Sequence, residues 1–322
     1  MRKGLLCIVL ALMMLLSAAW ALAAPEGYTP AGATKNCFFY GENGYTVEYR
    51  YDYETMLGET MQGYIDSYNS KLGGEGTEVY FYFVNNSRSM DFTADNSGEN
   101  DIYLDLMSRL SCVDHHAALE IHTMADYERL FYQTDHHWNH VGAQQGYEDI
   151  LRLLGVEDAP IQPVEEVVFD AVYNGSYVKR TGVKNATQHF AVYRYELPDV
   201  KVTINGRMKK IGRADAYYAG KYSRDILATH YATFYGGDFG EIVYDTGMTD
   251  RENLLILCNS YGCSVRELVS CHFNKTYVVD MREYMTQTGN SMKIREYLEA
   301  HEIDKVLIIG DVSYFLYGKK LH

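Results

Sequence analysis

Residues 254–262 read Leu254-Leu-Ile-Leu-Cys-Asn-Ser-Tyr-Gly262, and this stretch decides the fold class. Its first five residues are apolar on both faces of an extended chain, which is typical of a strand buried in a parallel sheet. A short polar turn follows, and residues 264–271 then predict a helix. The same alternation continues with a strand at 276–279, a helix at 291–301 and a strand at 305–309. Alternating strands and helices predict an α/β fold, with helices on both faces of a parallel sheet.

The earlier part of the chain extends this pattern. Apolar residues recur at helical spacing between positions 52 and 72, and Gly73-Gly74 predicts the end of that helix. Residues 78–84 (EVYFYFV) predict a second buried strand. Three further elements are expected: a helix at 101–110, a short strand at 111–113 and a helix at 142–154.

Residues 160–250 have a different texture. Short β-type stretches at 167–172, 190–195 and 200–204 are separated by Gly, Asn and Asp, and Asn205-Gly206 is a good signal for a tight turn. We therefore predict a β-rich insertion within one α/β domain that spans residues 45–322.

Composition narrows the class of protein. The chain has 322 residues, 47% of them hydrophobic, so a sizeable core is expected and disorder is excluded. Its 29 Lys and Arg against 43 Asp and Glu give a net charge of -14. Binding to nucleic acid depends on clustered basic residues, so a nucleic-acid partner is not expected.

The N-terminus predicts export. Arg2 and Lys3 precede an apolar run over residues 5–19, and Ala21-Leu22-Ala23 is the small-residue pattern of a cleavage site. We predict a signal peptide at 1–23, an extended leader at 24–44 and a secreted or extracytoplasmic protein; an uncleaved N-terminal anchor is the alternative. Five cysteines would remain, and we expect mostly buried thiols, with a Cys263–Cys271 or a Cys37–Cys112 disulfide left open.

Two segments carry residues suited to catalysis. In Thr134-Asp135-His136-His137-Trp138-Asn139-His140, an extended backbone would place Asp135 and His137 on one face and turn His136 away. An aspartate beside an imidazole fixes its tautomer, as a general base requires, and Trp138 could form a wall of the pocket.

The second segment is the turn that contains Ser260. It follows a buried strand, and ligands of open α/β sheets bind at the carboxyl ends of the strands. A serine needs a nearby imidazole to become a nucleophile, and His137 is the candidate. Two other interpretations of this segment stay open: Ser260 as an N-cap, and Cys258 or Cys263 as a cysteine nucleophile, although a buried strand cysteine is expected to be inert.

These residues resemble a known family. Asp135-His136-His137-Trp138 resembles the signature of the DHHW proteins, an exported bacterial group similar to the SGNH hydrolase-like acetyltransferase domains of the alginate O-acetylation machinery. The resemblance covers most of the mature chain and implies an SGNH-hydrolase-like (flavodoxin-like) sheet. It also implies Ser260 as nucleophile, His137 as general base and Asp135 as its orienting acid. Candidates for the oxyanion hole and the pocket are Asn259, Tyr261, Gly236, Gly237, Trp138 and His136.

The sequence departs from the family pattern in two places. An aspartate commonly precedes the serine, where this chain has Asn259, and Asp311 stands near the position of an expected asparagine. The first departure weakens the prediction of activity. Arg88, after the first buried strand, is expected to be a solvated arginine rather than a contact for an acidic glycan.

The predicted function is acyl transfer on an extracellular carbohydrate, by an O-acetyltransferase or an acetylesterase without a cofactor. A cell-envelope glycan is the expected partner, with a membrane protein as a possible source of acetyl groups. Two alternatives are a catalytically weak glycan-binding or scaffold protein, and a metal-dependent hydrolase. The second would use His and Asp from the two DHH stretches, at 114–116 and 135–137, with His140.

Overall fold

The computed structural model describes residues 28–30, 37–40, 44–48, 58–73, 76–89, 101–208, 230–316 and 320–322. The predicted signal peptide lies outside these residues. Across the described ranges, every helix is too short or too polar to cross a membrane.

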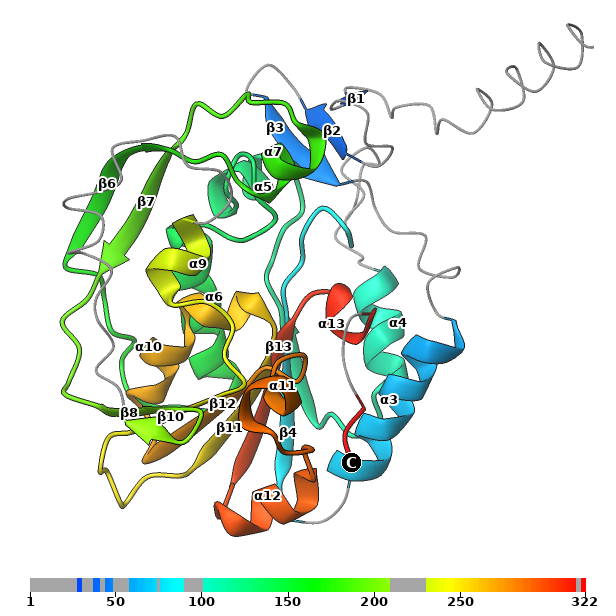
Figure 1. Cartoon of the computed structure of the whole chain (residues 1–322), viewed down its shortest axis with the longest axis vertical. Coiled ribbons are helices and arrows are strands. Elements are labelled where there is room, and N and C mark those ends of the chain that lie inside the picture. Colours follow the sequence, from blue (N-terminus) through cyan, green and yellow to red (C-terminus); the bar gives the residue numbers. More distant parts are fainter. Residues whose placement is uncertain are drawn as a thin grey trace, which may run out of the picture.

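An eight-stranded sheet forms the centre of the molecule, in the order β5-β4-β13-β11-β12-β10-β8-β9. The first five of these strands are parallel, and the other three extend the sheet in antiparallel fashion (Figure 1). The strand bounds are β4 Glu78–Phe83, β5 His115–Ala118, β8 Lys201–Ile204, β9 Arg207–Met208, β10 Glu241–Asp245, β11 Leu254–Cys258, β12 Lys275–Val279 and β13 Lys305–Gly310.

Helices cover both faces of this sheet, as predicted. Successive residues of β11 point to opposite faces, so Leu254 and Ile256 belong to one core cluster and Leu255 and Leu257 to the other. The first cluster includes residues of α6 (His140–Leu153) and α10 (Arg266–Ser270). The second includes residues of α3 (Glu59–Leu72), α4 (Asp101–Arg109), α12 (Ile294–Ala300) and α13 (Ser313–Leu316). The α/β fold is therefore confirmed, and it explains why the central strands are apolar throughout.

The region 160–250 is β-rich, and its strands go to two places. β6 (Glu165–Val172) and β7 (His189–Arg194) pair with each other in a separate two-stranded sheet. β8, β9 and β10 instead join the antiparallel end of the main sheet. Asn205 and Gly206 have φ of 47° and 73° and form the tight turn between β8 and β9. Within the described residues this region thus adds to the main sheet as well as forming a pair of its own.

Three short strands precede this domain core. β1 (Tyr28–Pro30) and β2 (Cys37–Tyr40) lie in the segment predicted to be an extended leader, and β2 pairs with β3 (Tyr45–Glu48). The remaining helices are α5 (Met124–Leu130), α7 (Ser176–Thr181), α9 (His230–Tyr235) and α11 (Tyr284–Thr288), with a 3-10 turn, η1, at Ser260–Ser264.

The short strand predicted at 111–113 is wrong, because those residues form a turn and the strand comes later, as β5. Asp114 contacts Val79 through both its backbone and its carboxylate, so pairing along β4 begins only at His115. β5 is an edge strand whose first two residues, His115 and His116, are exposed. An edge strand of this kind has no apolar run to reveal it.

The cysteines agree with the prediction of unpaired thiols. Cys37, Cys112, Cys258, Cys263 and Cys271 are all free, and four of them are buried. Burial raises the pKa of the Cys263 thiol to about 12 and that of Cys258 well above its usual value. Neither thiol is suited to act as a nucleophile near neutral pH.

Packing of Trp138 against α6 gives a first prediction. A methyl group added at Gly146 would lie 2.4 Å from Cζ3 of the fully buried Trp138. We expect Gly146→Ala to lower the free energy of unfolding by about 1–3 kcal/mol, because overpacking forces side chains to shift. Urea unfolding measures the change. Gly63→Ala in α3 is the matched control: its nearest neighbour is the flexible Lys320 side chain at 3.5 Å, so a gain of up to about 1 kcal/mol is expected.

Candidate active site

The turn after β11 presents Ser260 at the carboxyl edge of the sheet. Asn259 is the N-cap of η1, since its side-chain oxygen accepts a hydrogen bond from the backbone N–H of Tyr261 at 3.2 Å. The interpretation of Ser260 as the cap is therefore wrong. Its hydroxyl, on a half-buried residue, is left to contact another group.

The loop before α6 is tight rather than extended. Phe131 and Trp138 form an isolated β-bridge that closes it, and Asp135 Oδ1 accepts a hydrogen bond from the backbone N–H of His137 at 3.0 Å. An aspartate that bonds to the backbone two residues on is a common turn device. The prediction that Asp135 and His137 share a face is confirmed, but a turn produces this arrangement, not a strand.

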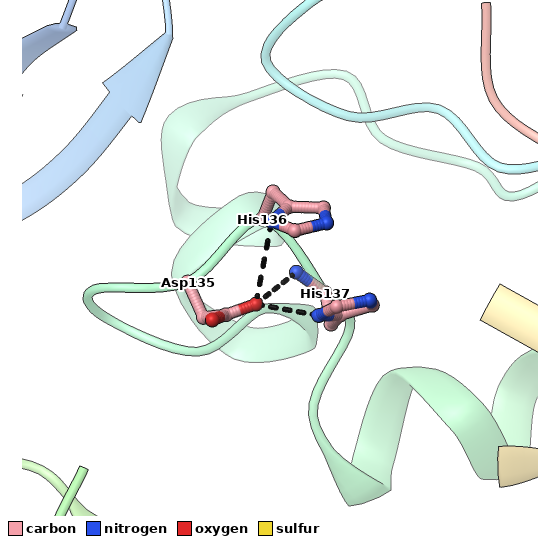
Figure 2. A group of neighbouring side chains, drawn as sticks. All are labelled: Asp135, His136 and His137. Carbon is pink, nitrogen blue, oxygen red and sulfur yellow. Dashed lines mark hydrogen bonds and ion pairs between the residues drawn. The ribbon is translucent and has the colours of Figure 1, made fainter. Parts of the chain in front are cut away.

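Three sequence-predicted residues meet in one chain of hydrogen bonds. Asp135 Oδ1 lies 2.6 Å from His137 Nδ1, and His137 Nε2 lies 2.8 Å from Ser260 Oγ. Figure 2 shows the first of these contacts within the loop. Asp135 is 2% exposed and His137 9% exposed, so the contact between them is shielded from solvent, whereas the contact with Ser260 is part-buried. This is the arrangement of acid, imidazole and hydroxyl that activates a serine.

The second oxygen of Asp135 is held as firmly as the first. Oδ2 accepts a hydrogen bond from the backbone N–H of Ser176, at the start of α7, at 2.6 Å. Burial by itself raises the pKa of Asp135, but the nearby His137 and His136 and the hydrogen bonds outweigh it, and the pKa lies well below the usual range. Asp135 is therefore a carboxylate across the pH range in which proteins function.

His136 does not turn away from the pair, which corrects the expectation from an extended backbone. Its ring centroid lies 4.0 Å from that of His137, and its Nδ1 lies 3.6 Å from Asp135 Oδ1 (Figure 2). The same nitrogen lies 2.7 Å from Ser176 Oγ. Burial and the neighbouring His137 lower the pKa of His136 well below its usual value. His136 is thus neutral beside Asp135 and His137.

The buried side chains of Trp138 and Tyr261 connect the histidine loop to the serine turn. Trp138 is fully buried and donates from Nε1 to Ser264 Oγ at 2.7 Å. Its indole is therefore part of the core, whereas the sequence predicted it to form a wall of the pocket. The Tyr261 hydroxyl donates to the His136 carbonyl at 2.6 Å and accepts from the Asn86 side chain at 2.7 Å. It joins the serine turn to the histidine loop.

Gly236 and Gly237 both have positive φ, 83° and 75°, a backbone conformation that residues other than glycine adopt poorly. The Gly237 carbonyl accepts from Arg266 at 3.1 Å, and the Tyr235 carbonyl accepts from the same guanidinium at 2.7 Å. The loop is thus held on Arg266. A role for either glycine as an oxyanion donor stays a prediction.

Asn259 and Asp311 meet under the serine turn. The Asn259 amide donates to Asp311 Oδ1 at 3.3 Å, and Asp311 Oδ2 pairs with Arg88 at 3.1 Å. Arg88 is 6% exposed and also pairs with Glu48 at 2.5 Å, so the prediction of a solvated arginine is wrong. An amide at position 259 can donate to this carboxylate, whereas an aspartate there would repel it.

Sequence reasoning missed Tyr231. Its ring stacks on His137 with centroids 4.0 Å apart and planes 9° apart, and its hydroxyl donates to the Ser260 carbonyl at 2.9 Å. The chain has 30 tyrosines, and nothing around position 231 distinguishes this one. Ser176 and Ser264 were missed for the same reason, because their roles depend on contacts across the fold.

A wide polar groove lies beside Gln133, at the start of the histidine loop. It has a volume of about 860 Å³, and Gln133, two residues before Asp135, is part of its lining. Its other walls come from Gly44, Tyr45, Glu128, Arg129, Asn185, Thr187 and Gln188. Amide and hydroxyl groups therefore dominate, with one charge of each sign.

The three loop residues Asp135, His136 and His137 also qualify as a possible metal-binding group, with one ligand atom of each lying within 4.8 Å of the others. In this arrangement Asp135 Oδ1 already accepts from His137, and His136 Nδ1 contacts Ser176. A metal ion would have to replace these hydrogen bonds. The other stretch considered for a metal site, Asp114, His115 and His116, does not form such a group among the described residues.

The family described as DHHW protein matches residues 85–279, and none of the curated proteins matches the chain. The structure is similar to that of a DHHW family protein from Eubacterium siraeum (17% identity, 91% of this chain and 95% of that chain, TM-score 0.65). It is also similar to Bacillus cereus PatB1 with a sulfonyl adduct (16% identity, 89% and 97%, TM-score 0.63). Likeness at these identities shows a shared fold.

A more distant likeness is that to the O-acetyltransferase domain of Pseudomonas putida AlgJ, at 11% identity over 87% of this chain and 92% of that chain. Its TM-score is 0.42, and no conclusion rests on it.

The contact between Asn259 and Asp311 gives a second prediction. Asn259→Asp places two carboxylates about one hydrogen bond apart in a buried site, and we expect it to lower the free energy of unfolding by about 3 kcal/mol. Adding Asp311→Asn should recover at least about 1 kcal/mol relative to the sum of the single changes, because the amide and the carboxylate have exchanged places. Urea unfolding of all four proteins measures the coupling.

Asn290→Asp, on an exposed residue, serves as the control for the added charge. Strict additivity of Asn259→Asp and Asp311→Asn would contradict the coupling.

Proposed function

The chain belongs to the DHHW protein family, and we propose that it is an exported enzyme that transfers acyl groups on an extracellular carbohydrate. The observation that carries the proposal is the continuous chain Asp135–His137–Ser260, at 2.6 and 2.8 Å. These residues come from two segments 123 positions apart, and both are buried or half-buried at the carboxyl edge of a mostly parallel sheet. This edge is where open α/β sheets bind their ligands.

The proposed reaction begins with attack on an acetyl ester. Ser260 Oγ forms a bond to the carbonyl carbon while His137 Nε2 accepts the hydroxyl proton, and Asp135 stabilises the imidazolium. The tetrahedral intermediate then loses the alcohol of the donor, which takes the proton from His137. A sugar hydroxyl resolves the acetyl-enzyme in a transferase, and water does so in an esterase. The backbone N–H of Ser260 is the proposed first oxyanion donor.

A carbohydrate is the proposed substrate because of the chemistry near the loop. The groove beside Gln133 is lined by amides and hydroxyls, a lining that suits ligands rich in hydroxyl groups. The net charge of the whole chain is -14, so a neutral glycan is favoured over a polyanion. Export, which brings the enzyme to such a glycan, rests on the N-terminal sequence pattern, and a membrane partner that supplies acetyl groups belongs to the same proposal.

A scaffold without activity is the main rival, because Asn259 departs from the family pattern. The contact of Asn259 with Asp311 weakens that rival: the charge expected at position 259 is present one hydrogen bond away. Asn259 also still caps the turn that presents Ser260. With Asn259 in place of an aspartate, the negative charge lies on Asp311 instead, and the Ser260 hydroxyl still contacts the His137 imidazole.

The third prediction tests the triad. Hydrolysis of p-nitrophenyl acetate should fall at least about 1,000-fold in Ser260→Ala and in His137→Ala. Asp135→Asn should also lose most activity, because the imidazole loses the carboxylate that fixes its tautomer and stabilises its charged form. Trapping during turnover, followed by mass spectrometry, should find acetyl on the Ser260 peptide. Ser270→Ala is the matched control: this buried serine donates to a carbonyl of its own helix, at Glu267, and has no contact with Ser260 or His137 among the described residues. Equal rates in wild type and Ser260→Ala would exclude the mechanism.

A sulfonyl fluoride provides a second measure, since a structure of PatB1 carries a sulfonyl adduct. Wild-type protein should form a covalent adduct on Ser260, and His137→Ala should slow it strongly. Metal content, measured on protein purified without a histidine tag, separates the metal alternative: stoichiometric zinc with activity lost on chelation would favour a metal-dependent hydrolase over the serine mechanism.

A further inference from the structure

Tyr231 contacts both of the groups to which the proposed function assigns the chemistry. It lies in α9, 3% exposed, with its ring 4.0 Å from the His137 ring and nearly parallel to it. Its hydroxyl donates to the Ser260 carbonyl at 2.9 Å and lies 3.1 Å from Ser264 Oγ. We infer that Tyr231 is a positioning residue that fixes the imidazole of His137 and the serine turn relative to each other. The inference rests on the proposed function of Ser260 and His137.

The stacked ring limits the motion of His137. The torsion that rotates an imidazole has broad minima, so hydrogen bonds at its two nitrogens alone leave the ring plane loosely defined. Tyr231 lies flat against it at 9°, and His136 is a second aromatic neighbour at 4.0 Å. A rotation of the imidazole that moved Nε2 away from Ser260 would break the stack with Tyr231.

The hydroxyl acts on the other partner. Donation to the Ser260 carbonyl ties Tyr231 to the backbone of η1 at the residue that carries the nucleophile. Ser264, one turn on, also accepts from Trp138 Nε1 at 2.7 Å, and Trp138 follows His137 directly. Tyr231, Ser264 and Trp138 thus connect α9, the serine turn and the histidine loop through a buried set of hydrogen bonds.

The ring also faces the charge that develops during the reaction. When His137 takes the proton of Ser260 it becomes a cation, and the face of an aromatic ring attracts a cation. The stack is therefore expected to favour the transition state over the resting state. Such a contribution changes kcat more than KM, because it is made only when the proton has moved.

The fourth prediction compares Tyr231→Phe with Tyr231→Leu. Phenylalanine keeps the ring and removes the hydroxyl, whereas leucine removes both. With p-nitrophenyl acetate we expect kcat to fall about 10- to 100-fold in Tyr231→Leu, with KM within about 2-fold of wild type. In Tyr231→Phe the expected loss is about 3- to 10-fold. The rate of Ser260 sulfonylation should follow the same order, since it reports the activation of the hydroxyl directly.

Tyr235→Leu, one turn further along α9, is the matched control: it removes a neighbouring ring, which packs on Tyr231 with centroids 4.9 Å apart, but leaves the Tyr231 ring and hydroxyl in place. It should keep nearly wild-type rates. Melting temperatures of all variants show whether loss of folding explains a loss of rate.

An NMR signature separates positioning from general stability. A ring stacked at 4.0 Å shifts the carbon-bound protons of the His137 imidazole upfield, so these resonances should stay shifted in Tyr231→Phe and move downfield in Tyr231→Leu. His137→Ala identifies the resonances. Wild-type kcat in a folded Tyr231→Leu would overturn the inference, as would unshifted His137 resonances in the wild type. If Tyr231→Leu fails to fold, Tyr231→Phe and the wild-type spectrum still decide. Full activity of Ser260→Ala would instead refute the proposed function, while the NMR shift would still report the stack.

Discussion

The buried contact between Asp311 and Arg88 is the interaction on which the other features of the site depend. Both side chains lie under the serine turn, and neither charge can be left without a partner at that depth. Glu48 completes the cluster by pairing with Arg88 and with Arg180 of α7. Among the described residues, two acids and two arginines are thus joined by ion pairs. These pairs fix the N-terminal strand β3, the loop after β4, the end of β13 and α7 to one another.

Hydrogen bonds of neutral side chains connect this cluster to the serine turn and the histidine loop. Asp311 accepts from Asn86 and Asn259, Asn86 donates to the Tyr261 hydroxyl, and that hydroxyl donates to the His136 carbonyl. The path runs from a buried ion pair to the backbone of the histidine loop in three steps. The loop and the turn are thus held together by buried polar groups that bond to one another instead of to solvent.

The elements that were predicted correctly share one property: their residue patterns are local. The strands at Glu78–Phe83 and Leu254–Cys258 are apolar on both faces, and α6 places Ala143, Tyr147 and Ile150 at helical spacing toward the core. β5 was missed because an exposed edge strand carries His115 and His116 where a core strand would carry valine or isoleucine. Arg88 was misjudged because Glu48 and Asp311, its acidic partners among the described residues, lie 40 and 223 positions away along the chain.

The same division applies to the site. The sequence by itself determined the α/β class, the tight serine turn, and the pairing of Asp135 with His137, because a turn closes that contact over two residues. Only the tertiary structure decided that His137 reaches Ser260 across 123 positions, that Asn259 faces Asp311, and that Tyr231 covers the imidazole. Contacts between distant segments depend on how β11, β13, α9 and the histidine loop pack at one edge of the sheet. The local spacing of residues does not predict that packing, since many sequences with the same pattern could place different side chains at this edge of the sheet.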